Sequence, residues 1–362
     1  MTQRIYNFNA GPAVLPLEVL KAVQDEMLNY QATGMSILEI SHRSKAYEEV
    51  NRQAEATLKE LLGLGEDYRV LFLQGGASTQ FAMVPMNFLP SGRTADYILT
   101  GSWSEKALKE AKLFGNTHVA ATTADGNYKR IPNRDQIQLS DNPAYVHITS
   151  NNTIFGTQWQ EYPCFGQVPL IADMSSDILH KPFAADKFSL IYAGAQKNLG
   201  PSGVTVVIAR KELLENNRKD IPTMMRYETH AKNDSLYNTP PAFSVYVLNL
   251  VLQWVKNQGG LAGMQKRNEE KAALIYDAID QSNGFYRGHA EKDSRSVMNI
   301  TFRLPGEEQE KAFASEAEKA GLIGLKGHRS VGGLRASVYN AMTVEGCRAL
   351  QQFMLYFQKK NG

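Results

Sequence analysis

Short apolar runs alternate with amphipathic stretches through the middle of the chain, and this alternation restricts the fold more than any other feature. The apolar runs have the length of strands and lie at Arg69–Gln74, Ala95–Leu99, Tyr145–Thr149, Pro169–Ala172, Ser189–Ala193 and Val204–Ala209. Apolar residues recur at helical spacing in Leu17–Tyr30, Ala46–Leu62 and Glu105–Leu113. Alternating strands and helices predict an α/β fold with a mostly parallel sheet. Such sheets bind ligands outside the carboxyl ends of their strands, so the residues after each strand are candidates for chemistry.

The pattern changes after a long apolar helix predicted near Val245–Lys256, where Gly259 and Gly260 break the chain. The remaining elements are a helix at Leu261–Gln281, a strand at Val297–Phe302, a helix at Glu307–Ala320, a strand at Leu334–Val338 and a final helix. This order predicts a small α+β domain. We therefore expect a large domain over 17–258 and a small C-terminal domain over 259–362. An N-terminal segment, 1–16, is expected to pack with the small domain.

Charge and cysteine content exclude several classes of function. The net charge is only +2, so nucleic acid is not an expected partner. The two cysteines, Cys164 and Cys347, provide neither metal-type spacing nor a disulfide framework, which fits a reducing cytoplasm. The N-terminus has no apolar signal-peptide region, and the most apolar stretch, Phe243–Val255, is too short to span a bilayer. We expect a cytoplasmic protein with no metal and no membrane partner.

Lys197 and Asp173 each follow a predicted strand. An amine at a strand end can form a Schiff base with an aldehyde cofactor if burial depresses its pKa. A carboxylate one strand away can keep the pyridine nitrogen of pyridoxal 5′-phosphate (PLP) protonated, so that the ring withdraws electrons from the substrate. Alone, Lys197 is more simply a surface lysine and Asp173 a turn or helix cap. The two residues together favour a PLP site.

Two further motifs follow predicted strands. Gln74–Thr79 contains a glycine pair and opens a helical stretch, so its backbone amides are suited to a phosphate. Tight turns use the same residues, so this signal is weak on its own. Trp103 is placed to stack on a pyridine ring, although a tryptophan in the core is an equal alternative.

Longer strings of the sequence narrow the choice. They are Phe8–Ala13, Ser41–Arg43, Tyr192–Asn198, Tyr237–Pro241 and Lys326–Ser337. With these strings the chain resembles the phosphoserine aminotransferases, class-V members of PLP fold type I, from about residue 5 to the C-terminus. The strings around Lys197 and in Lys326–Ser337 are specific to that family. The resemblance implies a mostly parallel seven-stranded sheet in the large domain.

The resemblance also implies roles for individual residues. Lys197 would carry the cofactor as a Schiff base, Asp173 would pair with the pyridinium nitrogen, and Trp103 would stack on the ring. Thr153 would contact the phenolic-oxygen side of the ring. The residues implied to hold the cofactor phosphate are Ala77, Ser78, Gln196 and, from a neighbouring subunit, Asn238 and Thr239. The residues implied to bind substrate are Asn9, His42, Arg43, His328, Arg329 and Arg335, of which Arg335 binds the α-carboxylate.

The implied reaction is the reversible transfer of an amino group between L-glutamate and 3-phosphohydroxypyruvate, giving O-phospho-L-serine and 2-oxoglutarate in serine biosynthesis. Some members also use 4-phosphohydroxy-L-threonine in vitamin B6 synthesis. Some carry an arginine where this chain has Ser78, which leaves the pairs His42–Arg43 and His328–Arg329 to bind the distal anion. Surface salt bridges are the alternative for each pair. The planar fork of arginine suits both a phosphate and a γ-carboxylate.

A homodimer with shared active sites is the implied assembly. Pro240 and Pro241 stiffen the backbone after Asn238 and Thr239, which suits a polar tip that reaches across an interface. The alternative is a helix start that Thr239 caps. The alternative function is another fold type I enzyme, such as a cysteine desulfurase or a small-substrate transaminase, although neither cysteine is in a convincing position for a desulfurase. A PLP-sensing regulator would need an additional DNA-binding segment, and the end-to-end resemblance leaves no room for one.

Overall fold

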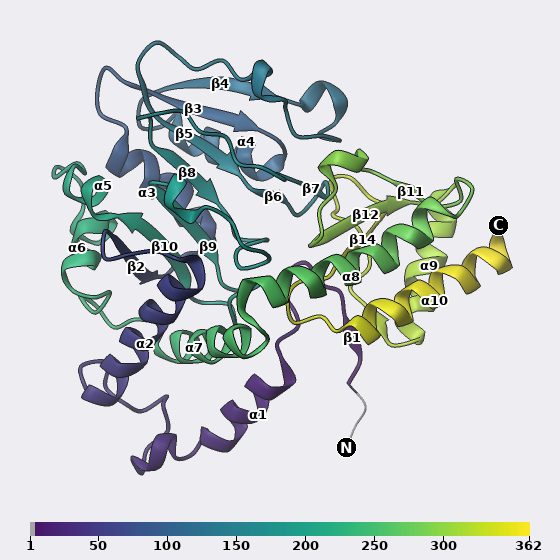
Figure 1. Cartoon of the computed structure of the whole chain (residues 1–362), viewed down its shortest axis with the longest axis horizontal. Coiled ribbons are helices and arrows are strands. Elements are labelled where there is room, and N and C mark those ends of the chain that lie inside the picture. The colour runs from purple at the N-terminus through teal and green to yellow at the C-terminus, as the bar shows by residue number, and fades with distance from the viewer. Residues whose placement is uncertain (1–3) are drawn as a thin grey trace.

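A seven-stranded sheet forms the centre of the computed structural model, which describes residues 4–362 (Figure 1). The strand order is β2-β10-β9-β8-β5-β3-β4. The strands are β2 (Tyr68–Leu73), β3 (Thr94–Leu99), β4 (Asn116–Thr122), β5 (Pro143–Thr149), β8 (Leu170–Asp173), β9 (Leu190–Gly194) and β10 (Thr205–Arg210). The neighbours from β9 to β4 are parallel, whereas β10 is antiparallel to both β2 and β9. The predicted α/β fold with a mostly parallel sheet is confirmed.

Six of the seven strands were predicted, with ends within two residues of those in the structure. The missed strand is β4, at the edge of the sheet. Its sequence, NTHVAAT, begins with polar residues, and most of the strand is not buried. An edge strand with one covered side lacks the continuous apolar run of a central strand.

Helices cover both faces of the sheet (Figure 1). Along β2, Val70 and Phe72 pack toward one face and Leu71 and Leu73 toward the other, as the two-residue period of a strand requires. The first face is covered by α2 (Lys45–Leu62) and α7 (Ala242–Asn257), and α1 (Leu17–Glu26) packs against α7. The second is covered by α3 (Gly76–Phe88), α4 (Ser102–Ala111), α5 (Lys211–Glu215) and α6 (Tyr227–Lys232).

A separate apolar core lies in the C-terminal part of the chain. Its elements are α8 (Gly260–Asp280), β11 (Arg287–Gly288), β12 (Asn299–Arg303), α9 (Glu307–Lys319), β13 (Leu322–Ile323), β14 (Leu334–Ser337) and α10 (Val344–Asn361). The strands β11, β12 and β14 form an antiparallel sheet. From the N-terminus, Phe8 enters this core and β1 (Tyr6–Asn7) pairs with β13. Residues 1–3 of the expected N-terminal segment lie outside the described residues.

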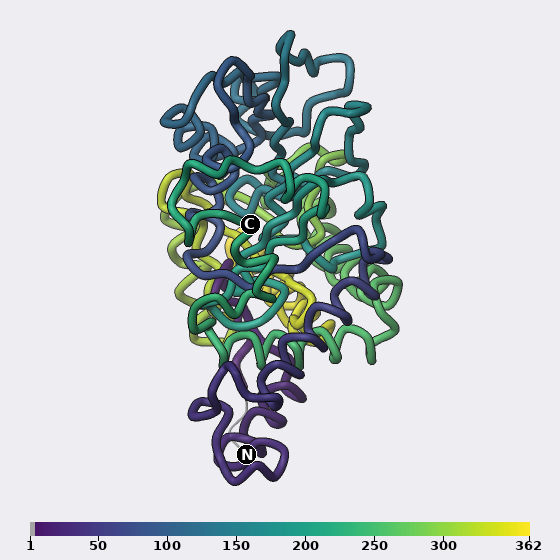
Figure 2. Tube along the Cα trace, turned by 90° about the vertical axis from the view of Figure 1, so that its left-hand side faces the viewer, coloured from purple at the N-terminus to yellow at the C-terminus, as the bar shows by residue number. Residues whose placement is uncertain are grey.

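An N-terminal arm, residues 17–44, extends from the body of the molecule (Figure 2). The helix expected over Leu17–Tyr30 ends earlier, at Glu26, and a 3₁₀ turn, η1 (Tyr30–Ala32), follows. The correction has a local cause. The side chain of Asn29 accepts a 2.8 Å hydrogen bond from the amide of Gly34, and such side-chain bonds compete with a helix.

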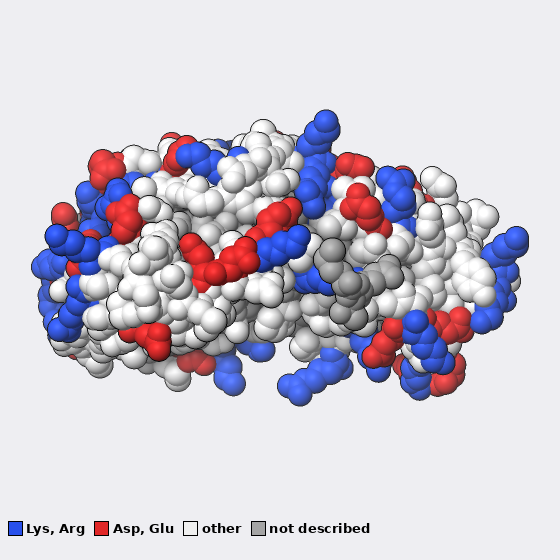
Figure 3. Space-filling model, turned by 90° about the horizontal axis from the view of Figure 1, so that it is seen from below, with Lys and Arg blue, Asp and Glu red and all other residues white. Residues whose placement is uncertain are grey.

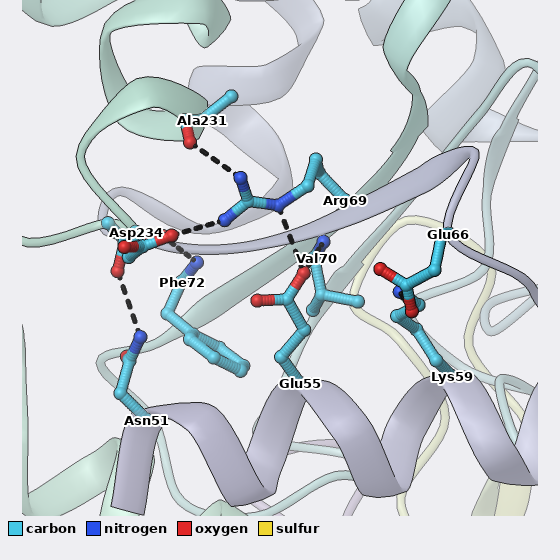
Figure 4. Close-up of polar contacts among 10 residues, drawn as sticks. Asn51, Glu55, Lys59, Glu66, Arg69, Val70, Phe72, Ala231 and Asp234 are labelled. Atoms are coloured by element: carbon cyan, nitrogen blue, oxygen red, sulfur yellow. Dashed lines mark hydrogen bonds and ion pairs between the residues drawn. The ribbon is translucent and has the colours of Figure 1, made fainter. Parts of the chain in front are cut away.

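A polar cluster around Arg69 ties α2 to the edge strand β2 and to the chain after α6 (Figure 4). The guanidinium of Arg69 donates to Glu55 Oε1 at 3.1 Å, to the Ala231 carbonyl at 2.9 Å and to Asp234 Oδ1 at 2.5 Å. Asn51 donates to the carbonyl of Asp234 at 2.8 Å. The cluster therefore fixes both a helix and a loop to the edge of the sheet.

The same loop closes the exposed side of β2. The amide of Phe72 donates to Ser235 Oγ at 2.9 Å, so a side chain satisfies a backbone group that an edge strand would leave open (Figure 4). Three residues later the chain reaches Asn238 and Thr239. The anchored loop thus sets the starting point of the segment that carries both residues.

The face of the molecule in Figure 3 carries basic and acidic residues interspersed rather than separated. Among residues 4–362, no helix has the length and apolarity needed to cross a membrane.

Candidate active site

Five segments that follow strands meet at one edge of the sheet. Lys197 follows β9, Asp173 ends β8, and Thr153 follows the short strand β6 (Asn151–Asn152) after β5. Trp103 lies in the first turn of α4, after β3, and Gln74–Ser78 follows β2. The carboxyl ends of all these sheet strands point the same way, because β2 and β9 are both antiparallel to β10. The structure confirms the expected placement of these residues at that edge.

Lys197 is a partly buried amine with one defined partner. Its Nζ donates a hydrogen bond of 2.8 Å to Thr153 Oγ1. Burial lowers the pKa of Lys197 to about 8, although the negative charge of Asp173 opposes this shift. A lysine with a pKa near neutrality supplies a substantial fraction of free amine, which is the nucleophilic and proton-accepting form.

Asp173 is a buried carboxylate, 5% exposed, on the strand next to Lys197. Its Oδ1 accepts a 2.9 Å hydrogen bond from the amide of Ser175. This is the turn geometry considered as the alternative interpretation, and the turn holds the carboxyl at the end of β8, beside β9. Burial raises the pKa of Asp173, opposed by the Ser175 hydrogen bond and by the positive charge of Lys197.

Thr153 connects Lys197 to Arg335 of β14. While the Thr153 hydroxyl accepts from Lys197, its carbonyl accepts a 3.2 Å hydrogen bond from Arg335 Nη1. The Nε of Arg335 is buried without a hydrogen-bond partner among residues 4–362. Burial lowers the pKa of Arg335, and the unpaired N–H leaves part of its planar fork free for an anion.

Trp103 flanks the amine. The centre of its ring lies 5.8 Å from Lys197 Nζ, and Lys106 Nζ lies 4.3 Å from it. The indole N–H is buried with no partner in the described chain, and the side chain packs against the cluster of Tyr128, Ile154 and Phe155. Lys106, one helical turn after Trp103, was not predicted from the sequence. A single exposed lysine in an amphipathic helix has no distinguishing pattern.

The N-terminus of α3 forms another side of this edge. Gly75, its N-cap, has φ +90°, and a Cβ there would lie 2.0 Å from Thr79 Oγ1, so only glycine fits. In the part of the chain that the structure describes, no side chain caps α3. The free amides of its first turn, which includes Ala77 and Ser78, therefore remain available to an anion.

The N-terminal segment runs past Lys197. The amide of Ala13 donates to the carbonyl of Gln196 at 2.8 Å, and a Cβ on Gly11 would lie 3.4 Å from the Lys197 side chain. Asn9 lies just before this contact and is exposed. Asn9 and Gln196 thus belong to segments that adjoin the amine.

His328 and Arg329 lie in the loop before β14. His328 Nδ1 is 2.7 Å from Ser330 Oγ. Burial, followed by the positive charges of Arg335, Arg329 and Lys106, lowers the pKa of His328. These three basic side chains lie close enough to His328 to shift its pKa, and none of them forms a salt bridge with an acid in the described residues.

Two predicted pairs are not joined to Lys197 by any contact within the described chain. His42 and Arg43 lie at the end of the N-terminal arm. Asn238 lines a pocket of about 360 Å³ together with Gly75 and Thr79 of the same chain. The expected alternative, Thr239 as a helix cap, is wrong: α7 begins at Ala242, and its N-cap is Pro241.

A buried polar group behind Asp173 was also missed by the sequence reasoning. Its members are Ser150, Gln158, Asp177 and His180, each no more than 2% exposed. Ser150 donates to the Asp177 carboxylate and lies 3.0 Å from the carbonyl of Asp173. The only signal in the sequence is the position of Asp177, four residues after Asp173.

Comparison with known proteins agrees with this geometry. The sequence model for the class-V aminotransferases matches residues 5–350. The phosphoserine aminotransferase of Niallia circulans is 61% identical over 362 residues, which cover 100% of both chains. The solved phosphoserine aminotransferase from Bacillus circulans subsp. alkalophilus superposes with a TM-score of 0.98, at 61% identity and 99% coverage of each chain.

A more distant solved structure contains the cofactor. It is the PLP-bound phosphoserine aminotransferase from Trichomonas vaginalis, which superposes with a TM-score of 0.92 at 40% identity and covers 97% of this chain and 100% of its own. Both the sequence and the fold therefore match along nearly the whole length. The chain belongs to the class-V aminotransferases and, within them, to the phosphoserine aminotransferases.

Proposed function

We propose that Lys197 and Asp173 are the catalytic residues with which this PLP-dependent transaminase moves an amino group between L-glutamate and 3-phosphohydroxypyruvate. The observation that carries the assignment is the Lys197 amine. It lies at the carboxyl edge of the sheet, burial brings its pKa to about 8, and it is held 2.8 Å from Thr153. Asp173 ends the neighbouring strand β8, at the same edge of the sheet.

The side chains present fit PLP. The buried indole N–H of Trp103 and the Nε of Arg335 have no partners among residues 4–362, and the first turn of α3 is uncapped over the same part of the chain. A carboxylate, an amine, an aromatic ring and a helix N-terminus are the groups that a pyridine nitrogen, an aldehyde, a ring face and a phosphate need. We assign Ala77, Ser78 and Gln196 to the phosphate and Thr153 to the phenolic-oxygen side.

In the mechanism, Lys197 moves the proton. PLP, when bound, supplies an aldehyde that bonds to amines and a protonated ring that withdraws electrons. Asp173 holds the proton on the ring nitrogen with its buried charge. The free amine of Lys197 would accept the α-proton of the substrate on Nζ and return it to the carbon two bonds away, which is a 1,3-shift. The two half-reactions then use the same residues in opposite order.

Basic residues bind the two ends of each substrate. Arg335 takes the α-carboxylate that phosphoserine and glutamate share, because its fork is partly free. We assign the distal phosphate or γ-carboxylate to His328 and Arg329, and to His42 and Arg43 of a neighbouring subunit. Asn9 completes the substrate site as an uncharged donor. Ser78 adds no charge here, so these basic side chains replace the arginine that some relatives have.

The active unit that we propose is a homodimer. The arm of residues 17–44 exposes Leu28, Met35 and Leu38 and extends away from the body of the molecule (Figure 2). An apolar arm of this kind is stabilised by burial against a second copy. It would carry His42 and Arg43 to the other site. Asn238 and Thr239 are assigned to the cofactor phosphate of the partner, although the pocket shared with Gly75 supports a contact within one chain as well.

The packing supports the expected domain division without fixing each boundary. Residues 17–258 contribute most of the cores on the two faces of the sheet, and 259–362 contribute most of the C-terminal core. The start of α8 packs in the first core through Leu261 and Met264. We therefore propose that α8 is the joint between the large and the small domain. We also propose a cytoplasmic location, supported by the two free cysteines.

Chemical trapping tests the function. Borohydride should fix PLP to Lys197, as peptide mapping would show, and label on another lysine would refute the assignment. Lys197→Ala should retain the fold and lose turnover. The visible absorbance of the purified enzyme should bleach with phosphoserine and with glutamate but not with alanine. Bleaching with alanine alone would favour the small-substrate transaminase. Neither cysteine supports a desulfurase, because Cys347 is buried and Cys164 lies in a separate pocket with Arg93 and Arg210.

A further inference from the structure

Asp177 is a second carboxylate buried behind the site. It is 1% exposed, and it lies one turn after Asp173. Its Oδ1 accepts from the hydroxyl of Ser150, and its Oδ2 accepts from Gln158 Nε2 at 3.0 Å. No lysine or arginine of the described chain forms an ion pair with it. A buried carboxylate held only by neutral donors is costly, so its presence calls for an explanation.

Ser150 connects the two carboxylates. Its amide donates to the carbonyl of Asp173 at 2.9 Å, and its hydroxyl lies 3.0 Å from the same carbonyl. The hydroxyl has one hydrogen, and the charged Oδ1 of Asp177 is the stronger acceptor. The orientation of Ser150, and with it the backbone that carries Asp173, therefore depends on Asp177.

Gln158 fixes the other oxygen of Asp177. His180 Nδ1 lies 2.5 Å from the carbonyl of Asp177 and must donate there, which leaves its Nε2 as an acceptor. Gln158 therefore donates one amide hydrogen to His180 Nε2 at 3.1 Å and the other to Asp177. Its Oε1 accepts from the amide of Val297, which leads into β12. Every polar atom of Gln158 is thus committed, and Asp177 is held in a single position.

The charge of Asp177 acts on the amine. Its negative charge raises the pKa of Lys197, the same effect that Asp173 exerts more strongly. Burial raises the pKa of Asp177 to about 6, so the group is charged at neutral pH. The titratable groups that face it are Asp173, His180, Lys181, Lys197, Tyr162 and Tyr339.

We propose that Asp177 is a positioning residue for proton transfer at Lys197. Its buried charge stabilises the positive charge that develops on Nζ when Lys197 accepts the substrate proton, and through Ser150 it fixes the backbone of Asp173. This inference rests on the proposed role of Lys197. It adds a carboxylate that does not itself touch substrate or cofactor.

Asp177→Asn isolates the charge, because the hydrogen bonds can be kept. The new amide nitrogen can donate to Ser150 Oγ, whose hydrogen then turns to the carbonyl of Asp173. The remaining oxygen still accepts from Gln158. The matched control is Asp96→Asn. Asp96 is also fully buried and accepts a 2.9 Å hydrogen bond from the amide of Ser140, away from the carboxyl edge.

The first measurement uses the enzyme freed of PLP and does not depend on turnover. Trace acetylation with acetic anhydride between pH 6 and 10, followed by mass spectrometry of the Lys197 peptide, reports the fraction of free amine. Removal of the negative charge should lower the pKa of Lys197. Labelling at pH 7.5 should therefore rise in Asp177→Asn, with an upper limit of about fourfold because an amine of pKa about 8 is already about one quarter free at that pH. It should stay at the wild-type level in Asp96→Asn.

The second measurement uses the holoenzyme. In Asp177→Asn, kcat should fall about tenfold while KM for glutamate changes less than about threefold. The acid limb of the kcat profile should move to lower pH. If the role of Asp177 were purely structural, the substitution would lower the midpoint of thermal unfolding. It would leave both the pH curve of Lys197 labelling and the acid limb of kcat unchanged. If Lys197→Ala still turned over substrate, the proposed catalytic role of Lys197 would be refuted. The acetylation result for Asp177→Asn would not be affected.

Ser150 gives an independent test if Asp177→Asn does not fold. Ser150→Ala keeps the amide that donates to Asp173 but removes the hydroxyl that donates to Asp177. It should lower kcat, whereas Ser150→Thr keeps the hydroxyl and should restore most of it. Wild-type labelling of Lys197 together with kcat within twofold of wild type in Asp177→Asn would overturn the proposal. If only the Ser150 variants can be measured, equal kcat in Ser150→Ala and wild type would overturn it.

Discussion

The Nζ of Lys197 lies 2.8 Å from the hydroxyl oxygen of Thr153. The same threonine presents its carbonyl to Arg335, so a single residue connects the amine to the arginine proposed for the substrate carboxylate. Thr153 is 3% exposed and follows the β6 turn, which leaves it little freedom to move. The separation of the Lys197 amine from the Arg335 guanidinium is therefore set in part by one short segment of backbone.

Thr153→Val should weaken PLP binding and turnover, whereas Thr153→Ser should resemble wild type. Valine keeps the shape and the carbonyl but removes the hydroxyl, at a cost of about 1 kcal/mol, or roughly fivefold. Equilibrium dialysis of PLP and kcat for both variants provide the measurement. Equal values for valine and serine would show that the hydroxyl has no role in the site.

Arg335→Ala should weaken phosphoserine and glutamate alike, because both present an α-carboxylate. The expected cost is roughly 2–5 kcal/mol in binding, typical of a charged partner lost from a partly desolvated site. Arg329→Ala or His328→Ala should weaken the same substrates through their distal anions and leave PLP affinity unchanged. Small, equal effects in all three variants would contradict the pocket assignment. Substrate titrations by absorbance measure each case.

Lys271 predicts a pH dependence of stability. It is fully buried, donates to the carbonyls of Val338 and Tyr339 at 2.9 and 2.7 Å, and burial lowers its pKa from 10.5 to about 7. Between pH 7 and 10.5 the unfolded chain holds a proton that the folded chain has lost. Stability therefore rises with pH in this window.

The comparison variant is Lys271→Met, which lacks the titrating group. The free energy of unfolding of wild type minus that of Lys271→Met should increase from pH 7 to pH 10, by at most about 1.4 kcal/mol per pH unit. Urea unfolding at several pH values measures it. If the free energies of unfolding of the two proteins changed with pH in parallel, Lys271 would have the same pKa in the folded and the unfolded chain.

Arg69→Met should loosen the loop that leads to Asn238. The substitution leaves Glu55 and Asp234 without their guanidinium partner, at a cost of about 1–3 kcal/mol of stability. Trypsin should then cleave faster after Lys232. Lys59→Met is the control: Lys59 lies on α2, the helix that also carries Glu55 (Figure 4), and its partner Glu66 is almost fully exposed. Equal cleavage in both variants would contradict the anchoring role.

The sequence predicts the positions of some residues of the candidate site and not of others. Lys197 and Asp173 follow apolar runs, so their place at the carboxyl edge follows from the pattern of a parallel sheet. Thr153 and Arg335 were assigned by family resemblance alone, because neither stands in a distinctive pattern. Lys106 was missed because its contact with Trp103 depends on the helix that brings the two side chains together, and an exposed lysine has no distinctive sequence pattern.

The buried group around Asp177 shows a second limit. A carboxylate after a strand is predicted as a turn or cap residue, and only the packed structure shows that Ser150 and Gln158 enclose it. The edge strand β4 was missed for a similar reason, because it is defined by pairing with β3 and not by an apolar run of its own. Properties that arise from tertiary contacts leave little trace in local sequence.

Subunit mixing tests whether the active site is shared. One chain carries Lys197→Ala and the other carries Thr239→Arg, whose bulk should block the phosphate site. After joint unfolding and refolding, half of the dimers should be mixed. If Thr239 acts on the partner, each mixed dimer has one site with intact Lys197 and intact Thr239, so roughly a quarter of normal activity should return. If Asn238 and Thr239 instead act within their own chain, as the pocket shared with Gly75 permits, both sites of a mixed dimer stay inactive. Correctly refolded mixed dimers without activity would thus exclude a site that Thr239 shares with the partner. The same experiment with one His42 variant and one Lys197 variant would decide the question for the N-terminal arm.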